Sequence, residues 1–416
     1  MNKQCPVFLP DATLCNQPVS YRGLCDLHAK HFKRGNGIGF NMIVKNEENC
    51  LEKTLKNIRG IADEIVITDT GSSDRTVEIA LEYADLVLFH EWQQDFSEAR
   101  NWGLQYATQN FIGWIDADEW INDPDQIPAI IEYCDKARMM TIICAMLSEL
   151  PGGRMGKHYL PKFFRYRTAH FEQPVHNQLI HSQPVHVSEI EFGHSGYNES
   201  PVIMRKKYKR SIGILRKQLK ENPDNTFAMM NLTRLLRREN EIDECREMIN
   251  RALKLETENS VIRQTLLMNK IFLCIDEDDP EIPDMLHEGL SLNPHNTDFL
   301  FMLAHWEFVK GNWIDTIIAL RAYQMEKANK DTAVHRINLL LDFWDVGILE
   351  NKMLGTALFA LKQYEQARQE FAVVLRTEKN NAHIWRDYLK CCNETGDEES
   401  AIAGYFAAVE NGIRIQ

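Results

Sequence analysis

The chain has 416 residues, too many for one ordinary hydrophobic core, so two or three domains are expected. Its 44% hydrophobic and 26% charged residues are typical of a soluble globular protein, and its formal net charge of −13 argues against a surface that binds nucleic acid as a whole. No apolar run approaches the roughly 20 residues that cross a bilayer, and the N-terminus lacks the apolar core of a signal peptide, so the sequence predicts a cytoplasmic protein without a membrane span.

Residues 1–37 combine cysteines, histidines and basic residues. Cys5, Cys15, Cys25 and His28 are separated by nine, nine and two residues. Three thiolates and one imidazole suit tetrahedral Zn²⁺, and such a site would fold a segment too small for its own core. The stretch CNQPVSYRGLCDLHAKHFKR resembles short Cys₃His zinc elements at the ends of phage and bacterial proteins. We therefore predict a structural zinc element, with His31 as the alternative fourth ligand and free cysteines in a disordered leader as the competing interpretation.

Residues 38–200 alternate short β-rich runs with helical patterns. Five runs predict strands: GFNMIVK, EIVITDT, LVLFHEW, FIGWIDA and TIICAML. Near-continuous apolar strands separated by helices are typical of a sheet that is covered on both faces. The sequence therefore predicts an α/β domain with a mixed central sheet over this range.

Acidic residues follow three of these strands. The first strand runs into Asn46 and Glu47, the second ends at Asp69, and the fourth ends in the stretch Asp116-Ala117-Asp118-Glu119. Ligands bind at the carboxyl ends of strands in open α/β sheets, and carboxylates this close together repel one another unless a cation lies among them. Asp116 and Asp118 alternate along the strand end and can face one metal ion. Glu119 points the other way and is expected in a turn or at a helix start.

Four motifs in this order, MIVKNEE, IVITDTGSSDRT, DFSEARN and WIDADE, resemble the nucleotide-sugar half of family 2 glycosyltransferases, which have the GT-A fold. The resemblance covers about residues 38–200 and points to the branch whose members carry a C-terminal tetratricopeptide region. It implies an inverting transferase that moves a sugar from a nucleotide-sugar donor, preferably a UDP-sugar, to a protein, peptide or glycan.

The resemblance also implies roles for the donor-side residues. Asp69 would read the uracil or the ribose, and Asn46 and Glu47 would line the donor site beside it. Arg100, followed by Asn101, would touch the nucleotide or order the acidic motif.

The metal-side residues follow from the same resemblance. Asp116 and Asp118 match the Asp-x-Asp element, which holds Mn²⁺ or Mg²⁺ together with the donor diphosphate, and Asp118 thereby takes part in catalysis. His194 in GHSGY occupies a place where the family often supplies a further contact to the metal or the diphosphate. Such an ion neutralises the charge on the departing nucleoside diphosphate.

The sequence departs from the family pattern at the expected general base. Relatives often have His-Glu where this chain has His176-Asn177, and an asparagine cannot accept the acceptor's proton. Either His176 takes that role or Glu172 does, and a loss of transferase activity is the remaining interpretation.

Residues 201–416 show helical periodicity with a repeat. A shift of 34 residues places Ala367, Phe371 and Val374 over Ala401, Tyr405 and Ala408, and Gly355 falls where a tetratricopeptide repeat has its close-packing glycine. Weaker copies are DECREMINRAL, IPDMLHEGL and WIDTIIALRAY. We expect about five degenerate copies in an all-α solenoid, with an irregular stretch near 329–350, and an unrelated helical bundle as the alternative.

Three functional hypotheses follow. The first is a metal-dependent glycosyltransferase whose acceptor docks partly on the repeats, which would bind a protein partner or mediate self-association. The second is a transferase acting on modified bases of phage-type DNA, motivated by the basic zinc-like element. The third is a non-catalytic interaction protein whose transferase domain has decayed.

Overall fold

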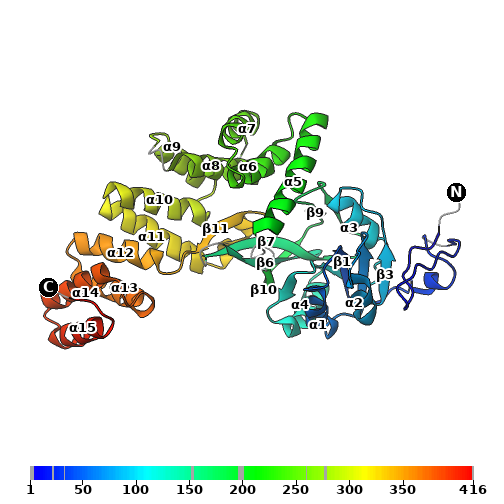
Figure 1. The fold of residues 1–416 in the computed structure, drawn as a ribbon, viewed down its shortest axis with the longest axis horizontal. Coiled ribbons are helices and arrows are strands. Elements are labelled where there is room, and N and C mark those ends of the chain that lie inside the picture. The colour runs from blue at the N-terminus through cyan, green and yellow to red at the C-terminus, as the bar shows by residue number, and fades with distance from the viewer. Residues whose placement is uncertain are drawn as a thin grey trace. The chain divides into compact units, whose positions relative to one another are not determined.

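The computed structural model describes residues 4–20, 23–31, 33–150, 154–194, 201–258, 260–275 and 279–414 (Figure 1). The chain divides into two compact units. The first comprises Met1–Glu149, Lys157–Leu255 and Ile337–Leu340, and the second comprises Leu150–Gly156, Glu256–Arg336 and Leu341–Gln416. The predicted boundary at residue 200 marks the change from strands to helices, whereas the first compact unit continues to residue 255.

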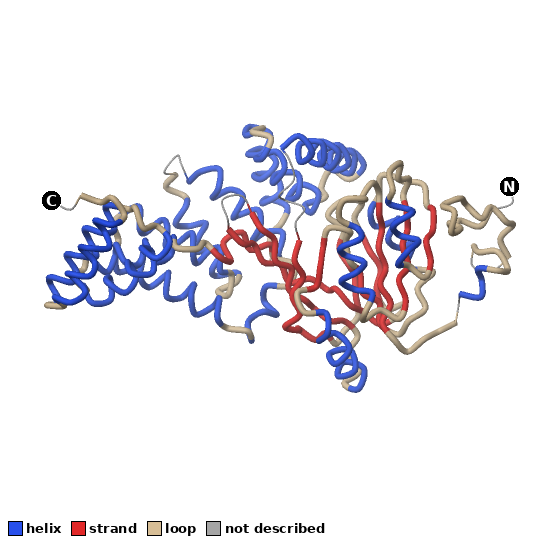
Figure 2. Tube along the Cα trace, turned by 60° about the horizontal axis from the view of Figure 1, so that its bottom comes forward, coloured by secondary structure: helices blue, strands red, loops and turns tan. Residues whose placement is uncertain are grey.

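The first unit is built on a mixed sheet with the strand order β3-β2-β1-β4-β7-β6-β10-β5, whose strands run side by side in Figure 2. A separate two-stranded sheet pairs β8 with β9. The strands are β1 Ile38–Val44, β2 Glu64–Asp69, β3 Leu86–Phe89, β4 Phe111–Trp114, β5 Glu119–Ile121, β6 Thr141–Leu150, β7 Arg154–Arg165, β8 Ala169–Glu172, β9 Gln178–His181 and β10 Val185–His194. All five predicted strands are confirmed, as β1, β2, β3, β4 and β6.

Strands β1 to β4 are parallel to one another, and their register brings three carboxyl ends together. Val44 of β1 pairs with Asp69 of β2, and Asn41 of β1 pairs with Trp114 of β4. The residues that follow β1, β2 and β4 therefore share one edge of the sheet, which is where open α/β sheets bind ligands.

Helices cover both faces of this sheet: α1 Leu51–Arg59, α2 Thr76–Tyr83 and α4 Ile127–Lys136 on one side, and α3 Phe96–Leu104 on the other (Figure 1). Alternation along β2 explains the arrangement, because Ile65 and Ile67 pack into the main core with α1 and α2, while Val66 joins a second cluster with Tyr106. Helix α3 approaches the sheet closely at Gly103, where an added Cβ would lie 2.5 Å from the Thr68 hydroxyl oxygen. The short helices η1 His28–His31 and η2 Pro124–Gln126 complete the N-terminal part.

The remaining chain is largely helical. The first unit contains α5 Pro201–Glu221, α6 Thr226–Arg238 and α7 Ile242–Leu255; the later elements are α8 Val261–Cys274, α9 Ile282–Leu292, α10 Thr297–Lys310, α11 Trp313–Ala328, η4 Asp331–Arg336, β11 Leu340–Asp345, α12 Leu349–Ala360, α13 Tyr364–Thr377, α14 Ala382–Thr395 and α15 Glu398–Glu410. Successive helices pack in pairs from α6–α7 to α14–α15, and the predicted copies lie on the second helix of each pair. The irregular stretch expected near 329–350 contains η4 and β11.

An α/β domain followed by tetratricopeptide-like helix pairs is thus confirmed. Within the described ranges, no helix combines the length and apolarity that a membrane span needs.

The last two helix pairs differ at the close-packing position. In the α12–α13 pair, Phe371 is buried against Gly355, where an added Cβ would lie 2.7 Å from the ring. The position 34 residues later is Leu389, whose side chain is itself buried, and Tyr405 is 47% exposed. The close approach in the α14–α15 pair is made at Gly404 instead, beside Tyr388.

The contact at Gly355 yields a stability prediction. Gly355→Val should lower the free energy of unfolding by roughly 2 kcal/mol, because the new side chain overlaps the buried Phe371 ring. Gly213→Ala is the control, since Gly213 lies inside α5 with no atom within 4 Å of an added Cβ, and it should raise that free energy by about 0.5–1 kcal/mol. Denaturant unfolding of both variants checks this, and equal effects would contradict the close packing at Gly355.

Candidate functional site

Two loops at the carboxyl edge of the sheet are tied together by Asn46. The residue has φ +58°, a left-handed conformation that asparagine tolerates well. Its side-chain oxygen accepts a hydrogen bond from the Ser73 amide at 2.8 Å, and its own amide donates to the Ser72 hydroxyl at 2.9 Å. The loop after β1 and the loop after β2 therefore form one surface.

Asp69 lies at the base of this surface and is 2% exposed. Its Oδ1 accepts hydrogen bonds from the amides of Gly71 at 2.9 Å and Ser72 at 3.1 Å. These bonds fix the turn after β2 and orient the carboxylate. Recognition of a base or ribose by Asp69 stays a prediction.

Arg100 and Asp116 form a short ion pair beside these loops. Nη2 of Arg100 donates to Oδ1 of Asp116 at 2.5 Å, and the guanidinium lies against the rings of Trp114 and Phe171, 4.8 and 5.3 Å from their centroids. Burial by itself raises the pKa of Asp116, but the positive charges of Arg100 and Lys162 outweigh it and hold the pKa below its usual value. The carboxylate therefore stays ionised at neutral pH.

The Arg100 guanidinium also has unused capacity. The residue is 4% exposed, and its Nε and Nη1 have no hydrogen-bond partner within the described part of the chain. A buried donor without a partner is costly, and a phosphate or carboxylate oxygen is the strongest partner for a guanidinium. Arg100 thus orders the acidic motif and keeps donors that an anionic ligand can use.

Asp118, in the turn before β5, lies beside His194 at the end of β10. His194 ends β10, which pairs antiparallel with β5 so that His194 lies opposite Glu119. Nε2 of His194 lies 3.4 Å from Oδ2 of Asp118. Burial alone lowers the pKa of His194, but Asp118, followed by Glu119 and Asp116, raises it above its usual value overall. The structure therefore brings the predicted His194 to the Asp-x-Asp element.

Glu119 has a different place from the one expected. It is the first residue of β5 rather than a turn or helix-entry residue, and it is 4% exposed. Its Oε2 lies 2.7 Å from Nζ of Lys162, which is fully buried and lies 3.6 Å above the Trp114 ring. The pairing accounts for the third carboxylate, because Lys162 supplies the positive charge that Glu119 needs.

Lys162 is the residue that sequence reasoning missed. The one available signal is a lysine within the apolar run YLPKFF, since a charged residue in a buried strand requires a partner. Thr54 of α1 also holds the backbone of the acidic stretch, because its hydroxyl lies 2.6 Å from the Ala117 carbonyl oxygen and 2.7 Å from that of Glu119. The backbone of the acidic stretch is therefore held on both sides.

The residues at this edge fit a divalent cation that is shared with a ligand. Asp118 and His194 lie together and offer oxygen and nitrogen donors, whereas Oδ1 of Asp116 is held by Arg100. In the described ranges, only the N-terminal cysteine group brings three or more ligand atoms within 4.8 Å of one another. The acidic edge is thus no all-protein cage, and an ion such as Mg²⁺ that takes one or two carboxylates plus phosphate oxygens suits it best.

Asn101 and Glu172 lie around an open hollow of about 610 Å³ beside α3. Both ends of the Asn101 amide bond the Phe171 backbone at 2.7 Å, so Asn101 fastens β8 to α3. Glu172 is exposed at the end of β8, with an oxygen 3.1 Å from Nε2 of His170. The hollow is lined by Asp95, Ser97, Glu98, Asn101, Trp102, Gln105, Phe171, Glu172 and Gln173. A nucleotide contact by Asn101 stays a prediction.

His176 lies in the loop between β8 and β9 with φ +52°. Desolvation by the surrounding protein, followed by the charges of Arg234 and Arg238, lowers its pKa to about 4. His176 itself keeps an exposed surface. The imidazole is therefore neutral at pH 7, as a general base must be, although a base of low pKa is a weak one.

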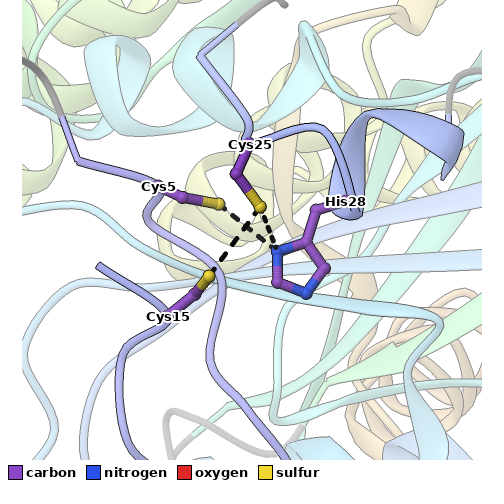
Figure 3. A group of neighbouring side chains, drawn as sticks. All are labelled: Cys5, Cys15, Cys25 and His28. Carbon is purple, nitrogen blue, oxygen red and sulfur yellow. Dashed lines mark hydrogen bonds between the residues drawn. The ribbon is translucent and has the colours of Figure 1, made fainter. Parts of the chain in front are cut away.

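The four predicted zinc ligands converge at the N-terminus. Figure 3 shows the side chains of Cys5, Cys15, Cys25 and His28 pointing toward one another, and their ligand atoms all lie within 4.8 Å. The side chain of His31, the alternative ligand, lies outside the described residues.

Glu47 provides a test of the crowding at the acidic edge. Burial raises its pKa above the usual value, and the negative charges of Asp118 and Asp116 act in the same direction. A raised carboxyl pKa favours the folded state below the unfolded pKa of about 4.3, and that contribution is lost as pH rises through the folded pKa.

We therefore expect Glu47→Gln to remove this pH dependence. The melting temperature of the variant minus that of the unmodified protein, measured without divalent cations, should increase as pH rises from about 4 to about 8. A difference that stays constant or falls with pH would contradict the repulsion among these carboxylates.

Comparison with known proteins identifies the region that holds this site. Residues 41–185 match the family model described as Glycosyl transferase family 2. A TPR repeat-containing protein of Synechococcus elongatus is 26% identical over 251 residues, which are 56% of this chain and 60% of that protein. The SPbeta prophage-derived glycosyltransferase SunS of Bacillus subtilis is 26% identical over 245 residues, which are 56% of this chain and 58% of that protein.

The chain thus spans somewhat more than half the length of these curated relatives. Among solved structures, the one titled "Crystal structure of YrrB: a TPR protein with an unusual peptide-binding site" is 18% identical, aligns with 47% of this chain and 91% of its own, and has a TM-score of 0.36. The family match is what bears on the site, since Asn46, Asp69, Arg100, Asp116 and Asp118 all lie inside it. Residues 41–185 are a glycosyl transferase family 2 domain.

Proposed function

We propose that this protein transfers a sugar from a nucleotide-sugar donor, preferably a UDP-sugar, to a protein, peptide or glycan acceptor. The observation that carries the proposal is the convergence of Asp69, the Arg100–Asp116 pair and the Asp118–His194 pair at one sheet edge within a family 2 domain. An edge with this combination offers a carboxylate for a base or ribose, a guanidinium for a diphosphate, and ligands for a hard cation.

Each group has a separate task in the proposed donor site. Asp69 and the loop of Asn46 and Glu47 hold the nucleoside. Arg100 orients Asp116 and offers its remaining N–H groups to the diphosphate. Asp118 and His194, with Asp116 close by, would hold Mn²⁺ or Mg²⁺, which when bound neutralises the charge on the departing nucleoside diphosphate.

The acceptor must lose a proton as the sugar is attacked, with inversion at the sugar carbon. We assign the base to His176, which is neutral at pH 7, and keep Glu172 as the alternative because it is exposed beside the hollow next to α3. The helix pairs are the proposed surface for an acceptor protein, another protein partner or a second copy of the chain. The net charge of −13 favours a protein or glycan acceptor over DNA.

The cation ligands are tested by Asp118→Asn. Loss of the carboxylate should lower the rate of UDP release from the best donor of a UDP-sugar panel with Mn²⁺ by about 10²-fold or more. Asp125→Asn, an exposed carboxylate on η2, is the matched control and should keep the rate. Unchanged release from the Asp118 variant would refute its role, and absence of release from the unmodified protein across the panel would favour the decayed-transferase hypothesis.

The general base is tested by comparing His176→Asn with Glu172→Gln. If His176 accepts the proton, its removal should lower kcat by about 10²–10⁴-fold, whereas the Glu172 variant should stay near the unmodified rate. The kcat–pH profile of the unmodified protein should show an acid limb governed by a pKa of about 4. The reverse ranking of the two variants would assign the base to Glu172.

A further inference from the structure

We propose that Cys5, Cys15, Cys25 and His28 bind one structural zinc ion that fastens the N-terminal segment onto the edge strand β3. The distances between the ligand atoms carry this assignment. Sγ of Cys25 and Sγ of Cys5 each lie 3.4 Å from Nδ1 of His28, and Sγ of Cys15 lies 3.8 Å from Sγ of Cys25. Tetrahedral zinc with bonds of about 2.3 Å to sulfur and about 2.0–2.1 Å to nitrogen places its ligands about 3.8 Å apart for S···S and about 3.6 Å apart for S···N.

The backbone builds this arrangement from two turns. A hairpin brings Cys5 and Cys15 together, with the Cys5 amide bonded to the Gln17 carbonyl and the Cys15 amide to the Val7 carbonyl at 2.8 and 2.9 Å. Cys25 lies just before η1 and His28 is its first residue, and the Ala29 amide donates to the Cys25 carbonyl at 2.8 Å. The hairpin and the turn at the start of η1 thus direct four ligand side chains toward one point (Figure 3).

The ligand set indicates a structural site rather than a catalytic one. Four protein ligands close the tetrahedron and leave no position for water or substrate. A disulfide explains the cluster less well, because the Cys15 and Cys25 sulfurs are 3.8 Å apart and such a bond would leave Cys5 and His28 unexplained.

The bound segment has a definite place on the transferase domain. The Phe8 amide donates to the Val87 carbonyl at 2.8 Å, and the Phe89 amide donates to the Pro6 carbonyl at 2.7 Å. The residues around Val7 therefore pair antiparallel with β3. Cys5, Val7, Leu24 and Cys25 also share a buried cluster with Val66, Leu88 and Tyr106, against which Trp102 of α3 packs. The zinc element therefore covers the edge strand β3, whose backbone groups would otherwise be open to pairing with another chain. It also packs against α3, the helix that carries Arg100.

Metal analysis of the purified 416-residue chain tests the site. The unmodified protein should contain about one zinc per chain, and Cys15→Ser and His28→Gln should each lose most of it, because the closed site needs all four ligands. Cys50→Ser, which removes a half-buried cysteine outside the cluster, is the matched control and should keep the zinc. Iron in place of zinc, a Cys15–Cys25 disulfide found by mass spectrometry, or four ligands that bind neither zinc nor Co²⁺ would overturn the assignment.

Hydrogen exchange tests the fastening and does not depend on folding of the variants. Removing zinc from the unmodified protein with a chelator should speed exchange of the Phe8 and Phe89 amides by about tenfold or more, while amides of the central strand β1 stay protected. Loss of zinc with no change at Phe8 and Phe89 would show that the metal does not hold the segment on β3.

Discussion

The structure depends on how it accommodates acidic residues that meet at one sheet edge. Glu47, Asp116, Asp118 and Glu119 lie close enough to act on one another, and carboxylates with no cation among them would repel. Two largely buried cations answer this: Lys162 pairs with Glu119, and Arg100 pairs with Asp116. For the fully buried Lys162–Glu119 pair, removing one partner is expected to cost about 3–5 kcal/mol. The edge is therefore pre-organised without a ligand, and the partly exposed Asp118 and His194 are the groups that can meet one.

Much of this arrangement could be predicted from local sequence. Each of β1 to β4 is a short, mainly apolar run with a polar residue at its end or within two positions after it, so its existence and its carboxyl end are both visible in the pattern. Lys162 stands out as a lysine in an apolar run, but its pairing with Glu119 could not be predicted, for a topological reason. It lies on β7, and β7 reaches β4 through an antiparallel register in which Gly113 pairs with Phe163. That pairing joins segments 50 residues apart in sequence, which no local pattern encodes.

The helical region shows the same limit at finer scale. The 34-residue shift places helices correctly, because the period reports which positions recur. It does not report how two neighbouring side chains share space. Leu389 stands where the preceding pair has Gly355, so the close contact moves to Gly404 and Tyr405 becomes exposed. At the N-terminus the reverse holds: four ligand residues were enough to predict the cluster, but pairing of that segment with β3 required the structure.

The central claim is that the acidic edge binds a nucleoside diphosphate together with a divalent cation. The most direct test is calorimetric titration of UDP into the unmodified protein and into Asp118→Asn, each with Mn²⁺ and again with EDTA. We predict that Mn²⁺ strengthens UDP binding to the unmodified protein by about tenfold or more and has little effect on the variant. UDP binding that is equally tight in EDTA, or absent under both conditions, would contradict the account.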